Sequence, residues 1–216
     1  MLIKAGQKLV FIGDSITDFE RARPVGEGLF GAIGKSYVGI VEGMMAAARP
    51  DDHIRVINMG IGGNTVLDLQ DRWQSDVMDL CPDWLAVYIG INDVWRQFDT
   101  PLQTEKHISP ALFESVYREL IERVKPTLKG GLILMTPHFL ELNKQDPMRI
   151  RMDEYADIVR RLAGEYGALL VDTQAAFDEF LQHNHPMVIN WDRIHPNVMG
   201  HCILARAFLK AVEYEF

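Results

Sequence analysis

The chain has 216 residues, which is enough for one compact domain with a sizeable core and hardly enough for two. Hydrophobic residues make up 48% of it and charged residues 24%, the usual balance of a soluble globular protein. The formal net charge is −8 and no lysine and arginine cluster stands out, which argues against nucleic acid or an anionic membrane as a partner. No apolar run approaches the length of a membrane-spanning helix. We therefore expect a single domain over residues 1–216 that binds neither nucleic acid nor membrane.

The two cysteines, Cys81 and Cys202, bear on the compartment. They belong to no CxxC or metal-spaced pattern, so we expect packed, reduced thiols and a reducing compartment. The N-terminal sequence MLIKAGQKLVFIGDS contains an apolar run that is too short for the core of a signal peptide. Both observations predict a cytoplasmic location.

Short apolar runs alternate with longer stretches of helical period, a pattern typical of strand and helix pairs around a parallel sheet. The pattern predicts five strands, at 8–12, 54–59, 84–89, 131–135 and 168–172. It predicts helices at 36–48, 65–79, 110–125, 148–166, 174–182 and 197–214, with polar loops at 19–34 and 93–109. Because crossovers between parallel strands are right-handed, we expect a three-layer α/β/α sandwich with the flavodoxin-like strand order 2-1-3-4-5. In such sheets ligands bind beyond the carboxyl ends of the strands, near the first and third strands.

Four polar segments lie at that predicted edge. GDSITD (13–18) follows the first strand, NMGIGGNT (58–65) the second and GIND (90–93) the third, while DRIHP (192–196) precedes the last helix. Together they supply a serine hydroxyl, glycine amides, a carboxamide and an Asp/His pair. Acyl transfer requires this set of groups.

Ser15, Asp192 and His195 have the residue types of a catalytic triad. A serine hydroxyl is a weak nucleophile until an imidazole removes its proton, and a carboxylate must hold that imidazole in one tautomer. Asp192 and His195 are three positions apart, so one turn of backbone can bring the carboxylate to Nδ1 and leave Nε2 for Ser15. The oxyanion that forms on attack needs hydrogen-bond donors, and the Ser15 amide, the Gly63 amide and the Asn92 side chain can supply three.

The four segments resemble the sequence blocks of the SGNH hydrolases, also called the GDSL lipase/acylhydrolase family, with GDSI here in place of GDSL. The resemblance implies a nucleophile, a base, an orienting carboxylate and two oxyanion donors, which are in that order Ser15, His195, Asp192, Gly63 and Asn92. Gly63 is preferred because it directly precedes the Asn-Thr pair of the second block. Gly60 and Gly62 lie close by and remain alternatives.

Longer stretches resemble the intracellular bacterial acetylxylan esterases of this family, among them FIGDSITDFERARPVGEGLFGAIGKSYV, IGINDVWRQFD and LMTPHFLELNKQDPMRIRMDEYA. This similarity runs in order over most of the chain. It implies a serine esterase that removes acetyl groups from xylo-oligosaccharides inside the cell and assembles into homo-oligomers. Such a reaction passes through an acyl-enzyme and needs neither a metal nor an organic cofactor.

Several other residues near the predicted site are candidates for contact with substrate. Trp95 and Arg96 follow Asn92, Trp191 precedes Asp192, and His138 follows the fourth strand. Aromatic rings suit the apolar faces of sugars, although tryptophan is also common in protein cores. The HxH pair at 183–185 lacks a nearby carboxylate or cysteine, so we interpret it as a solvated loop and expect no metal site.

Three rival interpretations remain open. The same chemistry would serve another short-chain ester, a thioester or a lysophospholipid, although the loops at 19–34 and 93–109 are polar for a long acyl channel. A non-catalytic flavodoxin-like module that binds a nucleotide or sugar would leave Ser15 and His195 out of hydrogen-bond reach. An assembly protein would use the same loops for subunit contacts.

Overall fold

The computed structural model describes residues 1–215 of the chain. One sheet of five parallel strands forms its centre, in the order β2-β1-β3-β4-β5, which confirms the predicted flavodoxin-like order. The strands are β1 (Lys8–Gly13), β2 (Arg55–Gly60), β3 (Trp84–Tyr88), β4 (Gly131–Met135) and β5 (Leu169–Val171). Gly13 at the end of β1 pairs with Gly60 of β2 and with Tyr88 of β3. These three strands therefore end level with one another.

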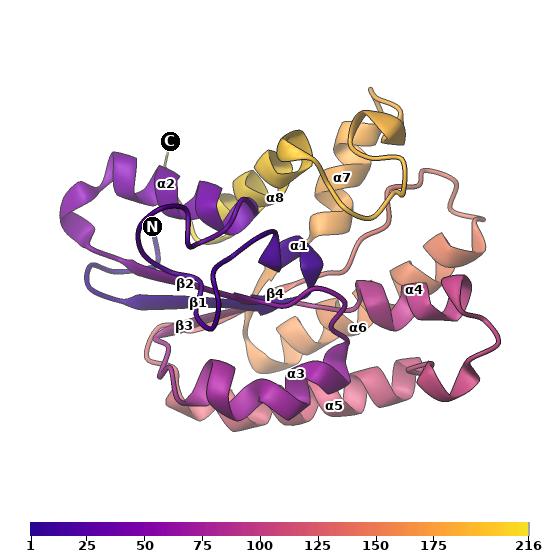
Figure 1. The fold of residues 1–216 in the computed structure, drawn as a ribbon, viewed down its shortest axis with the longest axis horizontal. Helices are drawn as coiled ribbons and strands as arrows, with labels where there is room; N and C mark the ends of the chain where they lie inside the picture. The colour runs from indigo at the N-terminus through magenta and orange to yellow at the C-terminus, as the bar shows by residue number, and fades with distance from the viewer. Residues whose placement is uncertain (216) are drawn as a thin grey trace.

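Helices cover both faces of the sheet, so the predicted three-layer α/β/α sandwich is confirmed (Figure 1). The helices are α1 (Ser15–Asp18), α2 (Tyr37–Ala48), α3 (Val66–Trp73), α4 (Ile91–Asp99), α5 (Pro110–Val124), α6 (Pro147–Tyr166), α7 (Thr173–Leu181) and α8 (Val198–Ala211). Helices α2, α7 and α8 lie on one face, and α3, α5 and α6 lie on the other. The strands β1, β3 and β4 are buried almost throughout because both of their faces are covered, which explains their continuous apolar sequences.

Side-chain caps fix where several helices begin. The Ser36 hydroxyl accepts a hydrogen bond from the Val38 amide at the start of α2, and Ser109 accepts one from Leu112 at the start of α5. Thr65 and Asp68 form a reciprocal capping box at the start of α3. Short helical turns join the main elements, namely the 3-10 turns η1 (Pro50–Asp52), η3 (Thr104–Lys106), η4 (Lys125–Thr127) and η5 (Pro186–Val188) and the π-helical turn η2 (Gln74–Met78).

The structure corrects two predictions about local structure. The predicted loop at 93–109 contains most of α4, which begins at Ile91 directly after Gly90. Asn and Asp near the start of this helix suggest a turn in the sequence, but burial of Ile91 and Val94 stabilises the helix. Cys81 and Cys202 are exposed free thiols rather than packed ones.

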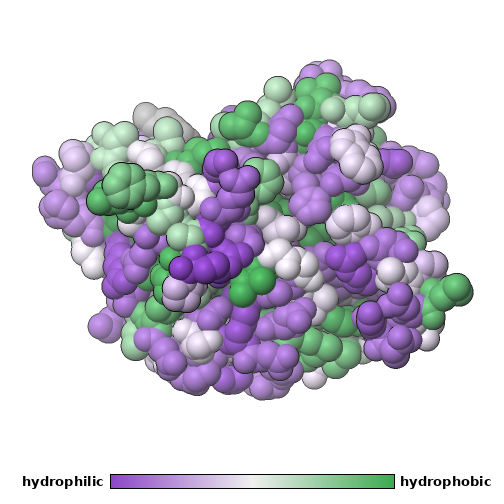
Figure 2. Space-filling view, viewed as in Figure 1, coloured by the Kyte–Doolittle hydropathy of each residue, from purple (hydrophilic) through white to green (hydrophobic). Residues whose placement is uncertain are grey.

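The surface carries isolated hydrophobic side chains. The face seen in Figure 2 is mostly hydrophilic, with separate hydrophobic groups rather than one large patch. No helix within residues 1–215 is both long enough and apolar enough to span a membrane.

Candidate active site

The loop after β1 presents Ser15 at the carboxyl end of the sheet. Gly13 leaves no room for a side chain, because a Cβ there would lie 2.3 Å from the Tyr88 carbonyl oxygen. The Asp14 carboxylate accepts a hydrogen bond from the Ile16 amide at 2.9 Å and caps α1. Ser15 is the first residue of that short helix and stands beside the loops that follow β2 and β3. The close packing of β1 against β3 thus fixes the backbone that carries the Ser15 hydroxyl.

Ser15, His195 and Asp192 form a continuous chain of hydrogen bonds. Ser15 Oγ lies 2.9 Å from His195 Nε2, and His195 Nδ1 lies 2.8 Å from Asp192 Oδ2. The other oxygen, Asp192 Oδ1, accepts hydrogen bonds from the amides of Ile194 at 2.9 Å and His195 at 3.0 Å. With its proton on Nδ1 and donated to Asp192, the imidazole presents Nε2 as an acceptor for the Ser15 hydroxyl. The binding-module interpretation required Ser15 and His195 to be apart, and the geometry contradicts it.

The three glycines of the second segment differ in what their amides do. The Gly60 amide donates to Asn58 Oδ1 at 2.9 Å, and the Gly62 amide donates to Asp18 Oδ2 at 3.1 Å. The Gly63 amide has no acceptor among residues 1–215, and Gly63 adopts a φ of +82°, which favours glycine. Of the three, Gly63 is therefore the one whose N–H is free to bind an added group.

Asn92 lies in the first turn of α4 and is almost completely buried. One N–H of its carboxamide donates to the Asn64 carbonyl oxygen at 2.9 Å. A carboxamide nitrogen carries two hydrogens, so the second remains available to another acceptor. The contact with Asn64 also joins α4 to the loop that carries Gly63.

The four predicted substrate-contact residues have different surroundings. The Trp95 ring meets the His195 ring edge to face at 5.7 Å between centroids, and the Arg96 guanidinium lies 5.1 Å from the centre of the Trp95 ring. Trp191 is 79% exposed. His138 is fully buried, with its Nδ1 2.5 Å from the Tyr88 hydroxyl, which argues against the predicted contact with substrate.

Two buried carboxyl groups lie close to the site. Burial raises the pKa of both Asp14 and Asp93 to about 7, because the charged form loses its hydration. Asp93 Oδ1 accepts a hydrogen bond from the Val66 amide at 3.0 Å, while its Oδ2 is buried without a partner among residues 1–215. Burial also lowers the pKa of His138 to about 3. Asp14 and Asp93 thus hold the backbone near the site in place, because each accepts a hydrogen bond from a backbone amide.

Sequence reasoning missed two residues that hold the site together. Asp18 accepts the Gly62 amide and pairs with Arg23 at 2.5 Å. Arg72 reaches from α3 to the ends of β1 and β2 and to Asn64. Asp18 belongs to the GDSITD segment, so its position was a usable signal. Nothing in the sequence around Arg72 indicates which strand its side chain meets.

The residues near Ser15 show no arrangement suited to a metal. Within residues 1–215 there is no group of three or more histidine, cysteine, aspartate or glutamate side chains placed to hold an ion. What the arrangement offers is a hydroxyl in contact with an imidazole, an imidazole held by a carboxylate, and free donors nearby. These groups suit acyl transfer to serine.

Comparisons with known proteins place the chain in one family. Residues 11–203 match the model of the GDSL-like lipase/acylhydrolase family, and the chain belongs to this family. It is 53% identical over 216 residues to an acetylxylan esterase of Geobacillus stearothermophilus, covering 100% of this chain and 98% of that protein.

Solved structures agree closely with this one. The crystal structure of that Geobacillus stearothermophilus esterase, Axe2, superposes with a TM-score of 0.98 at 53% identity, covering 100% of this chain and 98% of the other. LAE5, an alpha/beta hydrolase from the metagenome of Lake Arreo in Spain, gives a TM-score of 0.97 at 52% identity over 99% of this chain and 98% of its own. Three further structures are catalytic mutants of Axe2 in which one serine, one histidine or one aspartate is replaced by alanine.

Proposed function

We propose that this chain is an acetylxylan esterase that removes O-acetyl groups from xylo-oligosaccharides, with Ser15 as nucleophile. The observation that carries the proposal is the hydrogen-bonded chain from Ser15 through His195 to Asp192. The substrate follows from the full-length similarity to an acetylxylan esterase and to a structure described as an acetyl-xylooligosaccharide esterase. The catalytic mutants of Axe2 change the same three residue types that form this chain of hydrogen bonds.

The reaction proceeds in two halves. In the first half, Ser15 Oγ attacks the acetyl carbonyl carbon while His195 Nε2 takes the hydroxyl proton. His195 then gives that proton to the departing sugar oxygen, and the acetyl group remains on Ser15 as an ester. In the second half, water attacks this ester with His195 as base, and acetate leaves. Asp192 keeps the imidazole in the required tautomer and stabilises its charged form.

A negatively charged oxygen, the oxyanion, forms in each half of the reaction. We assign its stabilisation to hydrogen bonds from the Ser15 amide, the Gly63 amide and the Asn92 carboxamide. The assignment of Gly63 is supported by elimination, because the amides of Gly60 and Gly62 already have acceptors. Asn92 retains one free N–H after its hydrogen bond to Asn64. Preorganised donors of this kind stabilise the negative charge without reorganisation during the reaction.

The sugar lies against the aromatic side chains beside His195 in this proposal. Trp95 contacts the His195 ring, Arg96 packs over Trp95, and Trp191 stands exposed next to Asp192. Indole rings offer flat apolar surfaces that suit the faces of a pyranose. The alternative substrates are other short-chain esters or thioesters.

The proposal extends to assembly and location. Leu29 and Phe30 are 80% and 103% exposed in the loop between α1 and α2, and burial of these side chains would favour a homo-oligomer. Light scattering coupled to size exclusion measures the assembly directly.

Cys81 and Cys202 are free thiols, which suits a reducing cytoplasm.

The substrate is tested by acetate release. Wild-type protein is incubated with acetylated xylo-oligosaccharides and, in parallel, with the synthetic ester 4-nitrophenyl acetate. The proposal expects acetate from both, with the sugar esters turned over with the higher kcat/KM. Turnover of the synthetic ester alone would keep the serine mechanism and reject the sugar substrate, and no turnover of either would reject the esterase function.

A further inference from the structure

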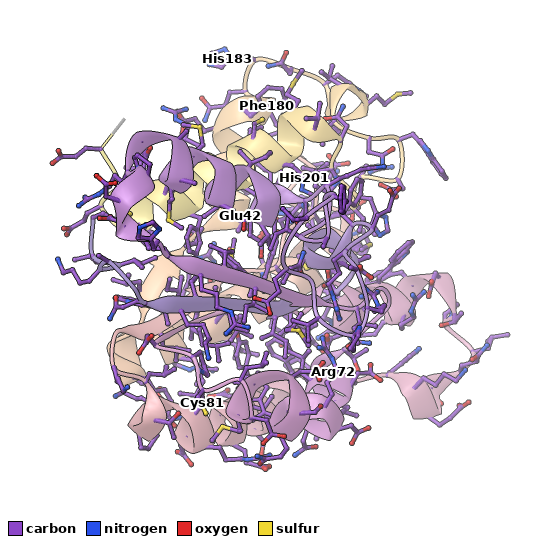
Figure 3. The ribbon with its side chains drawn as sticks, turned by 60° about the vertical axis from the view of Figure 1, so that its left-hand side comes forward. Glu42, Arg72, Cys81, Phe180, His183 and His201 are labelled. Carbon is purple, nitrogen blue, oxygen red and sulfur yellow. The ribbon has the colours of Figure 1, made fainter. Side chains whose placement is uncertain are left out.

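Arg72 occupies a central position beneath the proposed oxyanion site. It lies near the end of α3, and Figure 3 shows it between the sheet and that helix, toward the end at which the strand arrows point. Its side chain is only 12% exposed. Burial lowers the pKa of its guanidinium, although arginine stays charged at physiological pH. A buried cation of this kind needs several partners to offset the loss of its hydration.

The partners of Arg72 come from two segments of the site, 13–18 and 58–65, and from the turn after α3. Nη2 donates to the Gly13 carbonyl oxygen at 2.9 Å, and Nη1 donates to the Met59 carbonyl oxygen at 2.7 Å. Nε donates to Asn64 Oδ1 at 2.7 Å. Nη1 also meets Asp76 Oδ2 at 2.7 Å, one turn further along the chain. Three of these four contacts are made to the carboxyl ends of β1 and β2 and to the loop after β2.

Two of those contacts, with Gly13 and Asn64, lead to the proposed oxyanion donors. Gly13 stands two residues before Ser15, whose amide is one donor. Asn64 directly follows Gly63, the second donor. The carbonyl oxygen of Asn64 accepts the hydrogen bond of Asn92, the third donor. A single planar guanidinium therefore contacts the two segments that carry the Ser15 and Gly63 amides, and it is linked to Asn92 through Asn64.

We propose that Arg72 is a positioning residue that sets the spacing of the Ser15, Gly63 and Asn92 donors, an inference that rests on the proposed catalytic role of Ser15. Arginine suits this task because its donors point in fixed directions within one plane. A lysine carries the same charge on a single nitrogen and cannot reach the three acceptors in the same geometry. Because catalysis depends on donor geometry within fractions of an ångström, a loosened loop lowers the rate without removing a donor.

Four variants separate positioning from general stability. Arg72→Lys keeps the positive charge but loses the planar arrangement of several N–H donors. Arg72→Met removes both the charge and the donors. Asn64→Ala removes the acceptor of Nε and leaves the guanidinium in place. Asp76→Asn is the matched control, because it weakens the ion pair of the same guanidinium and leaves its contacts with Gly13, Met59 and Asn64 intact.

The readouts are steady-state kinetics with 4-nitrophenyl acetate and inhibition by methylboronic acid. A boronic acid adds to a serine hydroxyl as a tetrahedral anion shaped like the acetyl-transfer intermediate, so its affinity reports on the oxyanion donors. We expect Arg72→Met to lower kcat by about 10- to 100-fold, Arg72→Lys and Asn64→Ala to lower it less, and KM to change little. Affinity for methylboronic acid falls by a factor similar to the loss of kcat in each of these three variants. Asp76→Asn retains kcat and boronate affinity within about two-fold, although removal of one charge from this largely buried ion pair lowers the thermal midpoint.

Several outcomes would overturn the inference. One is an Arg72 variant that folds and keeps both kcat and boronate affinity; another is a loss of kcat in Asp76→Asn as large as that in Arg72→Lys. If the Arg72 variants do not fold, Asn64→Ala decides, since full activity and boronate affinity in that variant would contradict a positioning role. Wild-type activity on the synthetic ester is measured first. Its absence would reject the proposed esterase function, whereas its presence beside unaffected variants would reject only the role of Arg72.

Discussion

The two halves of the proposed active site are built differently. The half that holds Ser15, Gly63 and Asn92 stands on three neighbouring strands whose register is fixed by the β-ladder. The half that holds His195 and Asp192 is a loop without a strand beneath it. The proposed donors and nucleophile are thus held by the core of the sheet, and the proposed base lies on a loop outside it.

The loop of the base has a small number of attachments. The Leu140 amide donates to the Arg193 carbonyl oxygen at 2.9 Å, and the Asn190 carboxamide donates to the His195 carbonyl oxygen at 2.6 Å. Ile194 is buried, and Arg193 pairs with Glu141 at 2.5 Å. The comparison indicates that the proposed oxyanion donors have the more rigid support, whereas the His195 imidazole is held chiefly by its contacts with Asp192 and Ser15.

The largest loss of activity is expected from replacement of Ser15 or His195, whose hydrogen bond joins the two halves. Ser15→Ala removes the nucleophile and His195→Ala removes the base, so each lowers kcat by at least roughly 10³-fold. Because these residues act as a unit, the double variant is expected to be hardly worse than either single one. Kinetics with 4-nitrophenyl acetate measure both effects. Either variant with near wild-type turnover would contradict the triad.

The next largest loss of activity is expected from replacement of a hydrogen-bond donor in the half supported by the sheet. Asn92→Ala deletes one oxyanion donor and is expected to lower kcat by about 10²–10³-fold with little change in KM. Asn92 also binds Asn64, so methylboronic acid affinity is measured alongside. A rise in KM with kcat unchanged would show that Asn92 binds the ground state of the substrate rather than the oxyanion.

A smaller loss of activity is expected when a hydrogen bond that attaches the His195 loop is removed. Asn190→Ala removes the hydrogen bond to the His195 carbonyl oxygen and is expected to lower kcat by about 10-fold, because the imidazole is less well oriented. Glu141→Gln is the control, since its ion pair with Arg193 is partly exposed and contributes little. If the control loses as much activity as Asn190→Ala, the loop depends on its surface ion pair instead.

The smallest effect is on stability and concerns the buried carboxyl of Asp93. Its pKa is raised by burial from 3.8 to about 7, so between about pH 4 and 7 the folded protein keeps a proton that the unfolded chain loses. Rising pH therefore costs stability over this window. Asp93→Asn removes the cost, and the slope of unfolding free energy against pH becomes less negative by up to about 1.4 kcal/mol per pH unit.

Urea unfolding at several pH values between 4.5 and 6.5 measures that slope for wild type and variant. The comparison uses the difference between the two proteins, so other titrating groups cancel. Equal slopes would mean that Asp93 is ionised in the folded protein and that its unpartnered oxygen is stabilised in another way.

The sequence predicts the sheet-supported half better than the loop that carries the base. Strand positions and order follow from apolar periodicity and the handedness of crossovers, and the motifs mark the strand ends. Helix α4 was missed because Asn92 and Asp93 favour turns locally, while burial of its apolar face, which depends on the whole fold, decides its structure.

Side-chain roles that depend on tertiary structure could not be predicted from the sequence for the same reason. His138 follows a strand at the active edge, yet it turns inward to Tyr88 and is fully buried. Arg72 has its acceptors at Gly13, Met59 and Asn64, and only the folded arrangement brings these together. Residue type and spacing identify groups that react, whereas the groups that hold them in place emerge from packing.

The most direct test of the central claim is to trap the nucleophile. Wild-type protein, Ser15→Ala and His195→Ala are each treated with a fluorophosphonate, digested and mapped by mass spectrometry. The account predicts one phosphonate on Ser15 of the wild type, none at this position in Ser15→Ala, and labelling slowed by at least roughly 10³-fold in His195→Ala. A label on another residue of the wild type, or equally fast labelling of Ser15 without His195, would contradict a serine esterase built on this triad.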